Sequence, residues 1–139
     1  MTRRTLPALF ALVALALPAC LTEVDSTPRP EQVAAAKRFA ETLIHGGYAA
    51  AAGNFEAALA QDLDADRLRG MWEETTARVG APEHLDGVRA AQAEGLQIVY
   101  VRSKHAEGDI DIRLVFKDST AIRGVWFRPA DDHKSYQAL

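Results

Sequence analysis

The spacing of hydrophobic residues changes once along this chain, from a helical period to a strand period, near residue 84. Before that point apolar residues recur every three or four positions, which is typical of helices with one buried face. After it, β-branched and aromatic residues alternate with polar ones, which is typical of strands. Helices that precede a run of strands indicate an α+β fold with an antiparallel sheet. We therefore expect about three N-terminal helices packed on a sheet of about four strands.

The ends of the expected helices are marked by residues that start or stop helical structure. Pro30 suits a first helical position, and Asp64 can cap a later helix. Gly46 and Gly80 can end helices, whereas Gly53 weakens the helix that contains it, so that a break there is an alternative. The expected helices are 30–44, about 48–60 and 64–79.

Opposite charges assist the expected pairing of the two strongest strands. A four-residue turn at 105–108 places Lys104 opposite Asp109 and Arg102 opposite Asp111, and each such pair contributes roughly 0.2–1 kcal/mol. Burial of one sheet face fixes the register more strongly, because a shift by one residue would turn every side chain over. The expected strands are 84–93, which is weak, and 96–104, 109–117 and 121–128.

This register gives the sheet two unlike faces. One face is apolar, and we expect the helices to cover it; it holds Val99, Val101, Ile110, Ile112, Leu114 and Phe116. The other face is mixed in character and holds Ile98, Tyr100, Arg102, Asp111, Arg113 and Val115.

The facing of the last strand depends on the length of the turn before it. A three-residue turn at 118–120 puts Ile122, Gly124 and Trp126 on the helix side. A turn of two or four residues would instead put Arg123, Val125 and Phe127 there. We favour the first arrangement because it keeps the charge of Arg123 out of the core.

Residues 1–20 have the features of a bacterial export signal. A basic start is followed by an apolar stretch, which ends in Leu17-Pro18-Ala19-Cys20 and resembles a lipobox. We expect lipid attachment to Cys20, cleavage before it, and a membrane-anchored lipoprotein of the cell envelope. The alternatives are a secreted or periplasmic soluble protein cut after Ala19, or an uncleaved anchor. Residues 21–30 read as a tether, 31–130 as the domain, and 131–139 as a polar tail.

The charge balance and the cysteine count exclude several classes. Residues 1–20 hold two Arg and no acids, so that 14 basic and 19 acidic side chains remain after cleavage. Such an acidic chain is not expected to bind nucleic acid, which requires a basic surface. Cys20 is the only cysteine, so that no disulfide can form within one chain. No metal-ligand spacing and no cofactor motif stands out, and we expect neither a metal nor a cofactor.

Several segments together resemble a known bacterial family. The segments are Phe39-Ala40-Glu41, Leu68–Trp72, Val79-Gly80-Ala81 and Gly124-Val125-Trp126-Phe127-Arg128-Pro129. They resemble domain-of-unknown-function family 3887, which is similar to the nuclear-transport-factor-2-like superfamily, and the resemblance covers about residues 31–130. It implies a cone in which helices pack on a curved antiparallel sheet and enclose a pocket. Fold alone does not decide what such a pocket does.

The candidate binding residues follow from this cone. The expected pocket lining comprises Leu68, Trp72, Val99, Val101, Leu114 and Trp126. The expected interface on the mixed sheet face comprises Tyr100, Arg102, Asp111 and Arg113. Among the histidines, His45 ends a helix, His105 and His133 are expected in solvent, and His84 lies nearest the expected pocket mouth.

No set of residues identifies a catalytic centre. The first hypothesis is therefore a non-enzymatic module that binds a small apolar ligand or a protein partner. The second is a pocket enzyme of the isomerase or hydratase type, with His84 or Asp111 as its base. The third is a homodimer formed through the mixed sheet face. The enzyme requires a desolvated titratable group that faces the helices, so the facing of Asp111 and Trp126 discriminates between the first two hypotheses.

Overall fold

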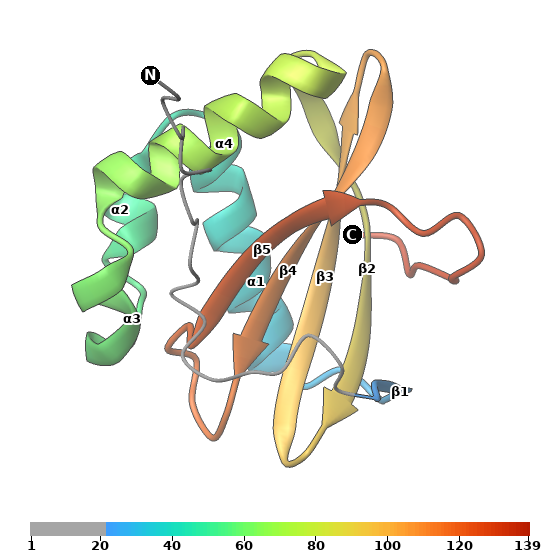
Figure 1. The fold of residues 1–139 in the computed structure, drawn as a ribbon. Helices are drawn as coiled ribbons and strands as arrows, with labels where there is room; N and C mark the ends of the chain where they lie inside the picture. The colour runs from blue at the N-terminus through green and yellow to red at the C-terminus, as the bar shows by residue number, and fades with distance from the viewer. Residues whose placement is uncertain (1–21) are drawn as a thin grey trace, which may run out of the picture.

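The computed structural model describes residues 22–139, in which four helices lie on one face of a five-stranded antiparallel sheet (Figure 1). The strand order follows the chain, β1-β2-β3-β4-β5. The α+β class is confirmed, although one more helix and one more strand form than expected. The elements are β1 (Val24–Asp25), α1 (Pro30–Ile44), α2 (Tyr48–Ala52), α3 (Ala57–Asp62), α4 (Ala65–Val79), β2 (Pro82–Ala93), β3 (Leu96–His105), β4 (Gly108–Phe116) and β5 (Gly124–Pro129).

The extra helix arises where Gly53 lowers the helix propensity of the sequence. The stretch expected as one helix is interrupted after Gly53, and α2 and α3 form on either side. Phe55 lies in the break, where it forms a parallel bridge with Ile122 and enters the core. The longer helices begin as expected, because Pro30 starts α1 and the Asp64 side chain accepts a hydrogen bond from the Arg67 N–H at the start of α4.

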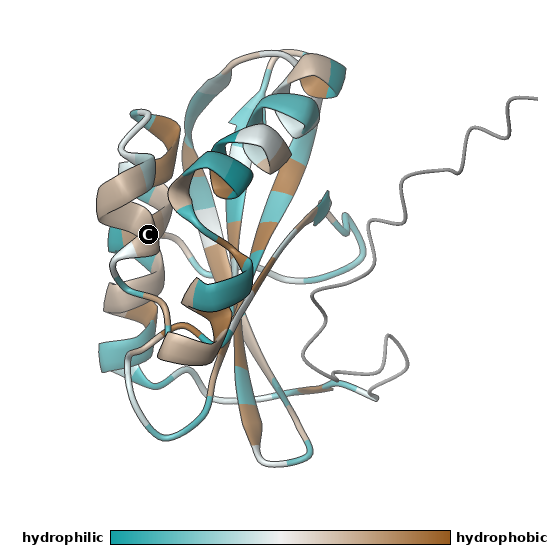
Figure 2. Ribbon diagram, turned by 60° about the vertical axis from the view of Figure 1, so that its left-hand side comes forward, coloured by the Kyte–Doolittle hydropathy of each residue, from teal (hydrophilic) through white to brown (hydrophobic). Residues whose placement is uncertain are grey.

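The main core lies between the helices and the sheet. Phe39 and Leu43 of α1, and Leu68 and Trp72 of α4, pack against the inward side chains of β3 and β4. Hydrophobic and hydrophilic residues alternate along the strands, as Figure 2 shows. The six residues expected on the helix face all lie in this buried cluster: Val99, Val101, Ile110, Ile112, Leu114 and Phe116.

The β3–β4 register is the one expected from the sequence. Lys104 pairs with Asp109, Arg102 with Asp111, and Tyr100 with Arg113. The turn, however, is two residues shorter than expected, because His105 and Gly108 also pair. Extending the ladder by one residue on each strand at the turn preserves the parity, so the faces of the hairpin are unchanged.

The last strand presents the opposite face to the one we favoured. Val125 and Phe127 pack on the helix side, whereas Trp126 lies on the other face beside Arg113. The expectation was wrong because β5 begins only at Gly124. The alternation of inward and outward side chains therefore does not extend back through the irregular connection between β4 and β5. Ile122 is nevertheless buried and Arg123 exposed. The charge of Arg123 is thus kept out of the core, which was our reason for favouring the other facing of the strand.

The first described residues, 22–29, and the C-terminal segment, 131–139, cover the outer sheet face, defined here as the face turned away from the helices; we call them the terminal segments. Residues 21–30 were expected as a tether; in their described part, β1 pairs with β2 at the sheet edge. In the C-terminal tail, the backbone of Gln137 pairs with Val88 of β2. A second hydrophobic cluster forms beneath them, with Ile98, Tyr100 and Val115 almost completely buried.

Candidate functional site

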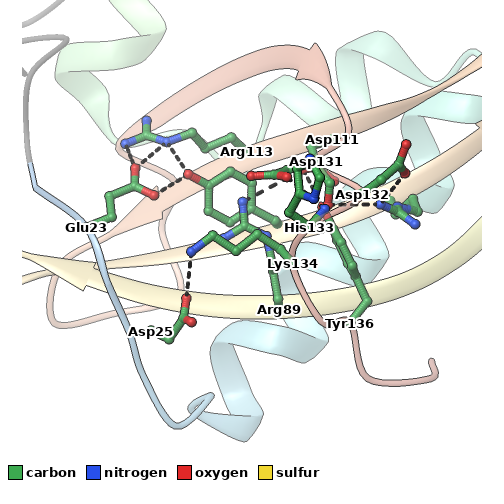
Figure 3. A network of polar contacts seen from close by, with 12 residues as sticks. Glu23, Asp25, Arg89, Asp111, Arg113, Asp131, Asp132, His133, Lys134 and Tyr136 are labelled. Atoms are coloured by element: carbon green, nitrogen blue, oxygen red, sulfur yellow. Dashed lines mark hydrogen bonds and ion pairs between the residues drawn. The ribbon is translucent and has the colours of Figure 1, made fainter.

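Seven side chains meet on the outer sheet face and form what we call the outer-face cluster (Figure 3). Three strands supply the central members, and the terminal segments supply one acid and one tyrosine. The members are Glu23, Arg89, Tyr100, Arg102, Asp111, Arg113 and Tyr136.

Glu23 connects the N-terminal segment to the middle of the sheet. The Arg113 Nη2 and Nε donate to Glu23 Oε1 over 2.7 and 3.0 Å, and the Tyr100 hydroxyl donates to Glu23 Oε2. Burial alone would raise the pKa of Glu23, but the hydrogen bonds from Tyr100 and Arg113 outweigh it and the net pKa is lowered. Glu23 is therefore held as a carboxylate that joins β3 and β4.

Asp111 performs the same role for the C-terminal segment. The Tyr136 hydroxyl donates to Asp111 Oδ2 over 2.5 Å, and Arg89 Nη2 lies 3.9 Å from the same oxygen. Burial raises the pKa of Asp111, although Tyr136, Arg89 and Arg102 oppose the shift. Burial likewise raises the pKa of Tyr136, which keeps its hydroxyl protonated as a donor. The other oxygen, Asp111 Oδ1, is buried without a protein partner.

Aromatic rings stack on Arg89 and Arg102, two of the three arginines of the outer-face cluster. The Arg89 guanidinium carbon lies 3.5 Å from the centre of the Tyr100 ring, and that of Arg102 lies 4.0 Å from the centre of the Tyr136 ring. The Arg102 Nη2 also donates to the Asp131 carbonyl oxygen over 3.3 Å. Such stacking contributes more when the cation is desolvated. The cations thus hold the C-terminal segment on the sheet.

A groove with a volume of about 290 Å³ lies between the two terminal segments. Its lining is mainly polar, in contrast to the apolar pocket expected from the sequence. The lining residues are Asp25, Ser26, Pro28, Arg89, Ala90, His133, Lys134, Ser135 and Gln137. Two donor atoms of this lining, Ser26 Oγ and Arg89 Nε, are buried without a protein partner.

The residues expected to line a pocket between helices and sheet are packed as core. Leu68, Val101 and Leu114 have no exposed surface, and Val99 and Trp72 have only 2% and 3%. A side chain without accessible surface contacts neither solvent nor a void large enough for water. Trp72 is instead enclosed by rings, with centroid distances of 5.6 Å to His105 and 5.0 Å to Phe127. Trp126, the sixth expected residue, lies on the outer face under Arg113.

The four residues expected to form an interface do lie together, on the outer face. They are not free, because the chain's own ends cover them. Tyr100, Asp111 and Arg113 are 7% exposed or less, and they bind Glu23 or Tyr136. Arg102 contacts the C-terminal segment at Asp131 and Asp132. The sequence did not predict that these segments cover the outer face. The two-residue strand β1 and the single Tyr136 are too short to give a periodic signal.

The histidines do not form a site. His84 is exposed on β2, and His133 is exposed in the C-terminal segment. His45 caps α1 and its Nδ1 lies 2.7 Å from the Glu41 carbonyl oxygen. His105, expected in solvent, is buried, with Nδ1 2.8 Å from the Gly80 carbonyl oxygen, because the β3–β4 turn is shorter than expected. Among residues 22–139, no group of three or more His, Cys, Asp or Glu could hold a metal ion.

Residues 1–21, and with them Cys20 and its lipobox, lie outside the described part of the chain. Within the described part, no helix has both the length and the apolar character needed to cross a membrane.

In residues 22–139, four helices lie on one face of an open antiparallel sheet and the outer-face cluster lies on the other. This arrangement defines a small α+β protein in which residues 22–29 and the C-terminal segment cover the outer face. Residues 36–125 match the family described as Protein of unknown function (DUF3887), and the chain belongs to this family. No curated protein and no solved structure matches the chain.

Proposed function

We propose that this protein is an exported, lipid-anchored domain of the cell envelope that binds a small polar ligand without catalysing a reaction. The observation that supports this function is the polar groove between the terminal segments, together with the packed core on the helix side. We further propose a cone of the nuclear-transport-factor-2-like type, in which binding occurs outside the cone. The apolar ligand suggested by the sequence has no matching lining among Leu68, Trp72 and Val101, which are core.

The groove is suited to a ligand with hydrogen-bond acceptors. Arg89 and Lys134 supply cationic donors, and Ser26 and Ser135 supply hydroxyl groups. A buried donor without a partner costs about 1–3 kcal/mol, but Ser26 Oγ and Arg89 Nε have almost no accessible surface. The Lys134 side chain, which is 44% exposed, is therefore the cationic donor of the groove that a ligand can reach. The volume is near the lower limit of small-molecule sites, which favours a ligand of few atoms.

The geometry gives less support to the pocket enzyme and to the homodimer. A base in a pocket would have to face a hollow, but Asp111 faces outward beneath Tyr136 and His84 is exposed. A dimer through Tyr100 and Arg113 would first have to displace Glu23. Sedimentation of the wild type and of Arg113→Glu tests the dimer: we expect a monomer in both cases, and a wild-type dimer lost in the variant would restore that hypothesis.

Native mass spectrometry of the purified protein tests the binding role. We expect a co-purified small molecule that is lost from Ser135→Phe, in which a ring fills the groove. Gln61→Phe is the control, because Gln61 is exposed on α3, away from the groove. A wild-type protein that carries no small molecule, or a molecule retained equally by Ser135→Phe, would contradict the proposal.

The lipid anchor has a separate test. Cells that express the wild type or Cys20→Ser are supplied with a labelled fatty-acid analogue. We expect label on the wild type alone, because the thiol is the attachment point. Equal labelling of both proteins would end the lipoprotein proposal.

A further inference from the structure

We propose that the outer sheet face is the side of this protein that lies against the membrane, and that Glu23 sets this orientation. The inference rests on the lipid anchor at Cys20 proposed above. It adds an interaction surface to that anchor, namely the face of the domain that meets a lipid bilayer.

The argument begins with the reach of the chain between the anchor and the fold. Glu23 is fixed to Arg113 and Tyr100 in the middle of the sheet. Only three peptide steps separate Cys20 from Glu23, and at 3.8 Å per step they span at most about 11 Å. A free tether of residues 21–30, with ten steps of the same length, would have reached at most about 38 Å. Docking of Glu23 therefore removes most of the expected freedom.

The acyl chains of a lipidated cysteine enter the bilayer, so Cys20 must lie at the membrane surface. With a reach of about 11 Å, the outer face around Arg113 must then lie close to the lipid headgroups. The helices are on the opposite face, with the core between them and the sheet (Figure 1). The α4 surface around Gly70 consequently faces away from the bilayer.

The docking contacts are strong enough to maintain this orientation at neutral pH. The carboxylate of Glu23 accepts charge-assisted hydrogen bonds from an Arg113 side chain that is only 9% exposed. Immediately after Glu23, β1 pairs with β2, and the Ser26 N–H donates to the Ala90 carbonyl oxygen over 3.1 Å. The segment is thus held by both a side chain and its backbone.

Fluorescence quenching in vesicles tests the orientation. The full lipidated protein is reconstituted in phosphatidylcholine vesicles that contain a lipid with a headgroup quencher. A single dye is attached either at Arg128→Cys, on the outer face of β5, or at Gly70→Cys, on α4. Both positions are exposed, and a Cβ at Gly70 meets no atom within 4 Å. We expect quenching at position 128 to be at least threefold stronger than at position 70.

A variant separates docking from anchoring. Glu23→Ala keeps Cys20 and its lipid but removes the contact with Arg113, so we expect the quenching ratio to fall toward one. Asp118→Ala is the matched control, because Asp118 is an exposed acid in the β4–β5 connection, outside both the docked segment and the groove. Equal quenching at both positions in the wild type, or a ratio unchanged by Glu23→Ala, would overturn the inference. Fatty-acid labelling of the same samples shows independently whether the anchor itself is present.

Discussion

Replacement of Glu23 by alanine is the most informative perturbation of this fold, because one side chain joins the N-terminal segment to two strands. The change removes the bonds from Arg113 Nη2 and Nε, over 2.7 and 3.0 Å, and the bond from the Tyr100 hydroxyl. It also leaves the Arg113 charge without its carboxylate, in a side chain that is 9% exposed.

The expected cost is about 2 kcal/mol. Removing one partner of a fully buried ion pair costs about 3–5 kcal/mol. Here the carboxylate is already 22% exposed, and the freed segment can move aside and let water reach Arg113, so that the loss is smaller. The loss is local, because the core between α1, α4 and the sheet does not depend on residues 22–29.

Native-state hydrogen exchange measures this loss where it occurs. The amide of Ser26, which donates to Ala90, reports on docking of the segment, and a loss of about 2 kcal/mol corresponds to roughly 30-fold faster exchange. We expect the amide of Val101 in β3 to be unaffected. Asp25→Ala should change Ser26 exchange by less than about threefold, because exposed pairs contribute little. Unchanged exchange of Ser26 in Glu23→Ala would refute the assignment of Glu23 as the docking contact.

Three further changes test other contacts. In Gly87→Ala the new Cβ would lie 2.9 Å from Tyr136 Cβ, so we expect the C-terminal segment to move and the Gln137 amide to exchange at least tenfold faster. Exchange of this amide at the wild-type rate would contradict the close approach. In Gln32→Leu the bonds to the β4–β5 connection are lost, so we expect urea denaturation to show a loss of about 1–2 kcal/mol, and no loss would exclude their role. Lowering the pH should speed exchange of the amides in residues 22–29. The pKa of Glu23 is lowered from 4.5 by folding, so the stability that its carboxylate contributes is present above that value and is lost as the pH falls toward the lower folded pKa. Exchange that does not depend on pH in this range, after correction for the intrinsic rate, would contradict this role of Glu23.

The sequence was sufficient to predict the elements that depend on interactions between residues close together in the chain. Asp64 caps α4, and the hairpin has the expected register with an ion pair between Lys104 and Asp109, because these preferences act between near neighbours in the chain. The class of the fold followed from the change of period. The family was also evident from short segments, and the match over residues 36–125 bears it out.

The structure was needed wherever residues far apart in the chain decide the outcome. Glu23 reaches Arg113 across 90 positions and Tyr136 reaches Asp111 across 25, and neither contact has a periodic signature. The facing of Trp126 depended on where β5 begins, which the irregular connection before it determines. The sequence by itself therefore determined the two long helices, the hairpin and its two faces, because periodicity and neighbouring charges are local. Only tertiary packing decided that residues 22–29 and the C-terminal segment cover the outer face, because that choice depends on burying charges supplied by strands remote in sequence.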